Sequence, residues 1–254
     1  MKLKNKKIIV TGGAGGIGSS IVKRLLKENA IVAVVDWNKE KLSQLEKQIP
    51  AEKRKNIFYY NLDIGEFNSV KKMVDDFFDK HKEIDALINN AATLADGLFV
   101  SVFRNKINKL SLESWGKTLR SNLHGCFYFS REVAEKMILK RTKGVIVNVS
   151  SISAAGNVGQ SCYAASKAAM DALTVTWAKE LSMFNIRVAG LAPGMTDTDM
   201  PKNAMGQSML ESWINKTPMK RMGTPEEIAH AIIFILENDF FCGRVLKIDG
   251  GLRM

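Results

Sequence analysis

Cysteine and histidine are scarce in this sequence of 254 residues, with three of each. Cys126, Cys162 and Cys242 are odd in number and far apart, which argues against a disulfide scaffold and predicts a reducing, cytoplasmic compartment. Neither the cysteines nor the isolated histidines have the spacing of metal ligands, so we expect no metal site.

Long apolar runs are missing as well. No stretch approaches the roughly 20 apolar residues that span a bilayer, so we expect no membrane partner. The basic N-terminus leads into only three apolar residues, 8–10, before glycines begin, which is too short for the core of a signal peptide. No linker-like segment and no repeat interrupts the chain. The sequence therefore predicts one globular domain over residues 1–254.

Basic residues outnumber acidic ones, 37 to 26, and the formal net charge is +11. We find no nucleic-acid-binding motif and no alternation of basic and aromatic residues, so nucleic acid is not an expected partner. Two explanations of the charge stay open. It is a solvated basic surface, or it attracts an anionic partner such as a nucleotide, a coenzyme A thioester or an acidic carrier protein.

Short apolar runs alternate with amphipathic segments of helical length along most of the chain. The strand candidates are residues 7–12, 30–36, 56–63, 85–92, 144–151, 186–194 and 244–251. The clearest helix candidates are residues 17–29, 69–82 and 225–238. This alternation predicts an α/β fold: a single doubly wound Rossmann domain with a seven-stranded, mostly parallel sheet and helices on both faces.

Two segments, 93–112 and 195–224, break the alternation. The second holds a short amphipathic stretch, 209–214, and reads as a lid over a site at the carboxyl edge of the sheet. We expect the two segments to form an apolar substrate pocket with a basic approach, or else to pack loops or subunit contacts. The residues concerned are Phe99, Phe103, Arg104, Lys106, Lys109, Met195, Met200, Met205, Met209 and Trp213.

A glycine-rich turn separates the first predicted strand from the first predicted helix. Gly12, Gly16 and Gly18 let the backbone approach a pyrophosphate, and the helix that begins near Ile17 offers it free N–H groups. Asp36 ends the second predicted strand, where a carboxylate accepts hydrogen bonds from an adenosine ribose. It would repel the extra phosphate of NADP, so we expect NAD(H) rather than NADP(H). A purely structural turn and a helix-capping Asp36 are the alternatives.

Tyr163 and Lys167 are four residues apart, so a helix places them on one face. An ammonium beside a phenol favours the phenolate, which predicts a pKa for Tyr163 below its usual value of about 10. A tyrosine tuned in this way passes a proton to or from a carbonyl oxygen. The pair alone is not specific, because a packed tyrosine and a solvated lysine often occur at this spacing.

Taken in order, these motifs resemble the short-chain dehydrogenase/reductase family from about Lys6 to Gly251. Within the family the chain is similar to 3-oxoacyl reductases and to hydroxyacyl or hydroxysteroid dehydrogenases. The motifs are TGGAGGIG at 11–18, Asp36, NNAA at 89–92, Asn122, Ser151, YAASK at 163–167 and PGMTDT at 193–198. Ala92 departs from the glycine that usually ends the third motif.

The resemblance implies a nicotinamide cofactor and assigns further contacts to it. These are Asp63 and Ile64 beside the adenine, Asn90 and Ala91 on the adenosine side, and Pro193, Gly194, Thr196 and Thr198 beside the nicotinamide and the diphosphate. Tyr163 and Lys167 belong to the same set, since the lysine is expected to hold the nicotinamide ribose.

The resemblance also implies a catalytic set of Asn122, Ser151, Tyr163 and Lys167. Tyr163 exchanges the proton, Lys167 lowers the pKa of that tyrosine, and Ser151 hydrogen-bonds the substrate oxygen. Asn122 fixes a water that relays protons. Ser150 is the alternative serine, because many relatives place the serine thirteen rather than twelve residues before the tyrosine.

We therefore predict an NAD(P)-dependent oxidoreductase that interconverts a secondary alcohol and a ketone, with a 3-oxoacyl or 3-hydroxyacyl thioester as the leading substrate. A sugar, polyol or steroid-like alcohol is the first alternative. A non-catalytic NAD(H)-binding module and a dehydratase or epimerase are the others. Relatives are often tetramers, so we expect a homotetramer built through the helices at about 113–141 and 161–184.

Overall fold

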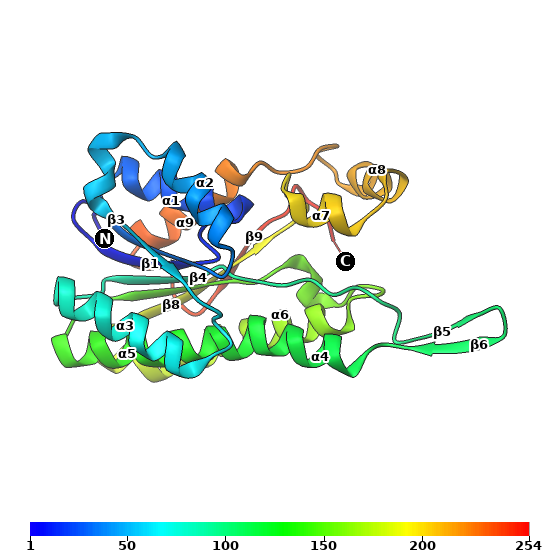
Figure 1. The fold of residues 1–254 in the computed structure, drawn as a ribbon, viewed down its shortest axis with the longest axis horizontal. Helices are drawn as coiled ribbons and strands as arrows, with labels where there is room; N and C mark the ends of the chain where they lie inside the picture. Colours follow the sequence, from blue (N-terminus) through cyan, green and yellow to red (C-terminus); the bar gives the residue numbers. More distant parts are fainter. Residues whose placement is uncertain (254) are drawn as a thin grey trace.

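The computed structural model of this chain describes residues 1–253 and is built on one seven-stranded sheet. The strand order is β3-β2-β1-β4-β7-β8-β9, and every neighbouring pair is parallel (Figure 1). The strands are β1 (Lys7–Thr11), β2 (Ile31–Asp36), β3 (Ile57–Asn61), β4 (Ala86–Asn89), β7 (Val145–Val149), β8 (Arg187–Pro193) and β9 (Val245–Ile248). Each lies within its predicted run, so the predicted α/β sheet is confirmed.

Helices cover both faces of this sheet (Figure 1). One face carries α1 (Gly16–Lys27), α2 (Lys39–Gln48) and α9 (Pro225–Glu237). The other carries α3 (Phe67–His81), α5 (Gly125–Lys140) and α6 (Ser161–Leu181), with α4 (Leu112–Leu119) packed against α6. Successive strand residues point to opposite faces, so Ile8 and Val10 join the first core while Ile9 joins the second. Burial on both faces explains why the strands are almost continuously apolar.

The strand order reverses between β1 and β4, which opens a crevice at the carboxyl ends of these two strands. Hydrogen bonds pin the two ends together. The Thr11 hydroxyl accepts from the backbone N–H groups of Asn90 and Ala91, at 3.0 and 3.1 Å. The Asn90 side-chain amide donates to the Thr11 and Gly12 carbonyls, at 3.0 and 3.1 Å. The first glycine of the turn is thereby fixed against the segment that follows β4.

The two irregular segments hold structure of their own at this edge of the sheet. Residues 195–224 contain α7 (Asp199–Ala204) and α8 (Gln207–Lys216). Within residues 93–112 the chain forms an antiparallel hairpin, β5 (Val100–Phe103) and β6 (Lys106–Lys109), that the sequence pattern did not predict. Figure 1 shows the hairpin projecting from the body of the molecule. In the described chain, no helix combines the length and apolar character needed to cross a membrane.

Candidate active site

A cleft of about 1630 Å³, including its open mouth, lies at the carboxyl edge of the sheet. Every residue expected to touch the cofactor lines it: Gly12, Gly16, Ile17, Gly18, Asp36, Asp63, Ile64, Asn90, Ala91, Tyr163, Lys167, Pro193, Gly194, Thr196 and Thr198. Of the expected catalytic residues, Ser151 lines the cleft too, whereas Asn122 lies behind its wall. Over residues 1–253 no group of three or more His, Cys, Asp or Glu side chains is arranged to hold a metal ion.

The glycine turn exposes backbone without side chains to the cleft. Gly12 has a φ of +61°, and a Cβ there would lie 2.7 Å from the Cα of Ala91. A Cβ on Gly18 would lie 2.1 Å from the Gly12 carbonyl oxygen, so a larger residue does not fit at either position. No side chain caps the start of α1 at Gly15, which leaves its first N–H groups available to an anion. The turn therefore fits a diphosphate.

Asp36 lies buried at the end of β2 with its carboxylate at the cleft wall. Its oxygens accept hydrogen bonds from the backbone N–H groups of Ala14, at 3.1 Å, and Asn38, at 3.0 Å. The cap of α2 is the Asn38 side chain, which accepts from Lys41 N–H, so Asp36 is not the helix cap. The carboxylate is oriented by its backbone bonds and keeps lone pairs for a ribose hydroxyl.

Two residues at the Asp36 end of the cleft were not predicted from the sequence. Trp37 lines the cleft next to Asp36 while 75% of its side chain stays exposed, which is unusual for so large an aromatic group. Lys41 also lines the cleft, and its ammonium lies 3.5 Å from the Asp199 carboxylate on α7. An aromatic residue directly after the strand-ending aspartate was the available signal for Trp37. Lys41 lies in the first turn of α2, and this turn places its side chain at the cleft.

Tyr163 and Lys167 share a face of α6, with the Lys167 ammonium 5.6 Å from the centre of the tyrosine ring. The ammonium is fully buried and donates to the Val149 carbonyl at 2.7 Å. Burial raises the pKa of Tyr163 to about 12, the Ser151 hydroxyl opposing the rise, and burial lowers the pKa of Lys167 to about 8. The expected lowering of the Tyr163 pKa is therefore wrong for the chain alone, because removing the phenol from water outweighs the hydrogen bond from Ser151.

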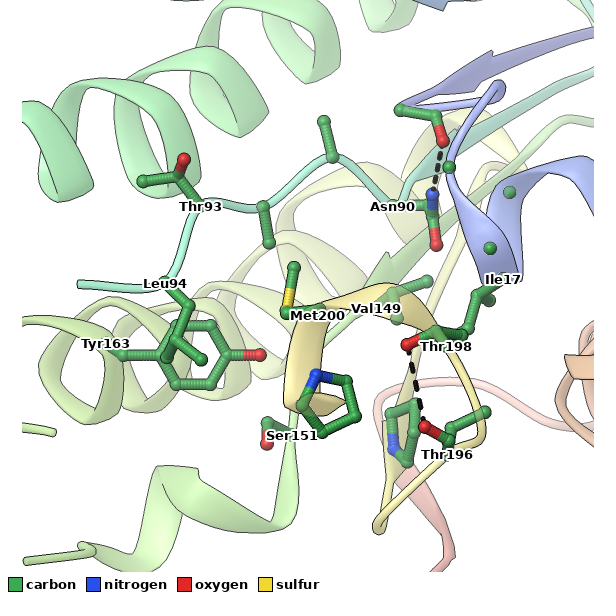
Figure 2. Close-up of a pocket in the computed structure, with 18 of the residues that line it drawn as sticks. Ile17, Asn90, Thr93, Leu94, Val149, Ser151, Tyr163, Thr196, Thr198 and Met200 are labelled. Atoms are coloured by element: carbon green, nitrogen blue, oxygen red, sulfur yellow. Dashed lines mark hydrogen bonds between the residues drawn. The ribbon is translucent and has the colours of Figure 1, made fainter. Parts of the chain in front are cut away.

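The two candidate serines have different surroundings. The Ser150 hydroxyl is buried and donates to the Lys167 carbonyl at 3.3 Å, which ties β7 to α6. The Ser151 hydroxyl accepts from Ser153 N–H at 3.1 Å and keeps its own proton available. Figure 2 shows Ser151 and the Tyr163 hydroxyl on the same side of the cleft. This arrangement favours Ser151 as the residue that meets a substrate oxygen.

Asn122 lies in a π-helical turn between α4 and α5 and is completely buried. Its amide accepts from Thr93 N–H at 2.7 Å and donates to the Thr93 carbonyl at 3.0 Å and to the Ser166 hydroxyl at 3.1 Å. π-Helical turns are frequent at functional sites. Here the turn lets one side chain hold the chain that follows β4 against the helix that carries Tyr163.

The end of the cleft beside Tyr163 includes several apolar side chains. Leu94 and Met200 lie around the Tyr163 ring and its hydroxyl (Figure 2). Of the expected pocket residues, Met195, Met200, Met205 and Trp213 line the cleft. Met209 does not, and neither do Phe99, Phe103, Arg104, Lys106 and Lys109. The cations expected at the approach, Arg104, Lys106 and Lys109, lie on the projecting hairpin rather than in the cleft wall.

Comparison with known proteins agrees with this geometry. Residues 6–208 match the family described as short chain dehydrogenase. The chain belongs to this short-chain dehydrogenase/reductase family. The 3-oxoacyl-[acyl-carrier-protein] reductase FabG of Thermotoga maritima is 37% identical over 99% of both chains, and the protein of the same name from Chlamydia pneumoniae is 35% identical over 98% of both. The sorbitol-6-phosphate 2-dehydrogenase of Klebsiella pneumoniae is 33% identical over 99% of this chain and 97% of its own length.

As a member of the short-chain dehydrogenase/reductase family, the chain is a nicotinamide-dependent oxidoreductase that acts on CH–OH groups. The non-catalytic module considered from the sequence is therefore not retained as its function. The predicted similarity to 3-oxoacyl reductases is confirmed by the two FabG relatives.

Proposed function

We propose that this enzyme interconverts a 3-oxoacyl thioester and its 3-hydroxyacyl product with NAD(H). The observation that carries the proposal is the convergence of Tyr163, Ser151 and Lys167 on a cleft whose other end holds the glycine turn and Asp36. The apolar lining around Leu94 and Met200 suits an acyl chain. Relatives named for 3-oxoacyl reduction match over nearly their full length.

The cofactor-facing residues fit a nicotinamide dinucleotide. The uncapped start of α1 receives the diphosphate, and Asp36 receives the adenosine ribose hydroxyls. When bound, the nicotinamide supplies or accepts the hydride. NAD(H) is favoured because the Asp36 carboxylate lies where NADP carries its extra phosphate. Lys41, a cation that lines the cleft at this end, is already paired with Asp199.

The chain itself manages the proton. The raised pKa keeps the Tyr163 phenol protonated at neutral pH, so it donates its proton to the carbonyl oxygen during reduction. The Ser151 hydroxyl donates a hydrogen bond to the same oxygen and stabilises the charge that develops on it. The Lys167 ammonium lies close to the Tyr163 ring, where it would bind the nicotinamide ribose. Asn122 positions the Thr93 segment of the wall.

The proposal is tested with acetoacetyl-CoA. We expect the enzyme to oxidise NADH in its presence, and NADPH to be used less well. Tyr163→Phe keeps the ring and removes the acid, so it should lower kcat by at least about 100-fold while the NADH dissociation constant changes little. A Phe variant that keeps most of its rate would show that Tyr163 is not the proton donor. No turnover with wild type, while NADH still binds, would remove coenzyme A thioesters from the proposal.

A polyol phosphate is the second candidate substrate, because the Klebsiella pneumoniae relative named for sorbitol 6-phosphate matches over the same length. Oxidation of sorbitol 6-phosphate with NAD, without any activity on acetoacetyl-CoA, would favour it. The apolar lining beside Tyr163 speaks for the thioester.

The proposal includes a cytoplasmic homotetramer. The helices expected to join the subunits each present an apolar side chain to solvent, Trp115 on α4, Phe127 on α5 and Val175 on α6. Exposed apolar groups on neighbouring helices of one layer are typical of subunit contacts.

A further inference from the structure

The β5–β6 hairpin, with the residues that flank it, forms an arm over residues 98–110 that stands away from the body (Figure 1). Every residue of its two strands is exposed except Ser101, which is half-buried. A two-stranded hairpin is at best marginally stable alone in water. We therefore expect the arm to be covered by a binding partner when the protein is active.

One face of the arm is apolar. The register pairs Val102 with Ile107, and Val100 lies two residues before Val102, so all three side chains share this face. Leu98 continues the same alternation. These four side chains keep between 50% and 70% of their surface exposed. Such a contiguous apolar face marks an interaction surface.

The arm carries three cations: Arg104 at the tip, Lys109 opposite Val100 on the apolar face, and Lys106 on the other face. Arg104, Lys106 and Lys109 form no ion pair within the described part of the chain, and no acidic residue occurs between positions 97 and 112. Arg104 occupies the first turn position at φ +48°, where asparagine or glycine is more favourable. The turn thus holds an arginine at the tip in spite of its backbone preference.

An apolar face with a cation at each end, Arg104 and Lys109, is complementary to an acidic protein surface. A second copy of this chain is a poor match for the arm, because a symmetric contact between two arms would bring their cations together. We propose that the arm docks an acidic carrier protein that presents the acyl thioester to the cleft. This proposal rests on the proposed function.

The base of the arm connects it to the cleft. The Gly97 N–H donates to the Gly159 carbonyl at 2.7 Å, and Gly97 forms a parallel bridge with Gln160. Gln160 lines the cleft three residues before Tyr163, and Leu94 lines it just before the arm begins. The strand from Phe99 to the tip spans about 17 Å. A partner on the arm thus stands beside the mouth, and a thioester on a flexible tether of about that length reaches Tyr163.

The test compares one thioester in two forms, on an acyl carrier protein and on N-acetylcysteamine. The variant reverses the three arm charges: R104E, K106E and K109E. Its matched control reverses three exposed cations far from the arm that also form no ion pair: K47E, K55E and K72E. We expect the arm variant to raise KM for acetoacetyl-acyl carrier protein by about tenfold or more at low salt, and the control by less than about twofold. KM for the N-acetylcysteamine thioester should not change in either.

A second measurement separates docking from catalysis. The holo carrier protein, with no acyl group, is titrated against wild type and against Arg104→Asn, which removes a charge while suiting the turn. Weaker binding by the variant supports docking on the arm, whether or not any thioester is reduced. Absence of thioester reduction would contradict the proposed function but not the docking proposal.

Two results overturn the arm proposal. The first is equal binding of the carrier protein by wild type and the charge-reversed arm. The second is loss of an oligomer when Val102 and Ile107 are changed to serine, because the face would then be an interface between copies of this chain.

Discussion

At the scale of single residues, the pKa values around Tyr163 set the expected pH dependence. Burial raises the pKa of Tyr163 to about 12, so the phenol is protonated at pH 7 and ready for reduction. We expect kcat/KM for ketone reduction to stay nearly flat from pH 6 to 8. For alcohol oxidation it should rise steadily toward pH 9, since the phenolate is then the base. Initial rates in both directions measure this. An oxidation rate independent of pH over that range would contradict the raised pKa.

Trp37 yields a prediction about the cofactor that does not depend on turnover. Its indole lies exposed at the cleft wall beside Asp36, so we expect the adenine of a bound dinucleotide to stack on it. We expect Trp37→Ala to weaken NADH binding by about tenfold, close to the worth of one aromatic stack. Binding is followed by quenching of protein fluorescence and by NADH emission. Trp37→Phe is the control and should recover most of the affinity, and unchanged binding in the alanine variant would remove Trp37 from the adenine site.

Residue types and spacing picked out polar residues that the fold gathers at one cleft, and they failed where burial decides. The glycine turn, Asp36 and the Tyr163–Lys167 pair each need one residue type at one backbone position, so they are legible in the sequence. The pKa of Tyr163 is not, because it depends on how much water the folded chain excludes. Trp37 and Lys41 enter the cleft only through the path that the backbone takes after β2.

At the scale of elements, α9 shows how a cap supports the sheet. The Thr224 hydroxyl accepts from Glu227 N–H at 3.2 Å, and the Glu227 carboxylate accepts from Thr224 N–H at 2.8 Å, a reciprocal capping box. Thr224→Ala should lower the free energy of unfolding by about 1 kcal/mol. Urea titration measures it, and Thr224→Ser should restore the loss. An alanine variant as stable as wild type would show that the box contributes nothing.

Elements with a strong period were predictable, and the hairpin was not. Helices α1, α3 and α9 carry regular apolar stripes over a covered face, so their ranges were predicted to within a few residues. The β5–β6 hairpin stands away from the body of the molecule, and its short strands lack the long apolar runs that mark the buried strands of the sheet. Its turn, Arg104-Asn105, is also not a usual hairpin signal. The arrangement was decided by local backbone pairing alone.

At the scale of the whole molecule, the expected tetramer is open to a direct test. Phe127 on α5 is 45% exposed beside a shallow hollow lined by Leu123 and Leu173. A charge at this position should break contacts between helices of neighbouring subunits. We expect Phe127→Glu to sediment as a smaller species than wild type. Phe240→Glu, at a side chain that is 99% exposed elsewhere, is the control. Wild type that sediments as a monomer at micromolar concentration would contradict the tetramer.

The segment that begins the lid lies directly over the glycine turn. A Cβ on Gly16 would approach the Thr198 side chain to 2.5 Å, and the Lys41–Asp199 pair joins α2 to α7 across the cleft. Because that pair is exposed, it is worth less than about 1 kcal/mol and opens readily. A dinucleotide lying under this segment is nevertheless held until the segment moves. We therefore expect an ordered reaction in which the coenzyme enters first and leaves last.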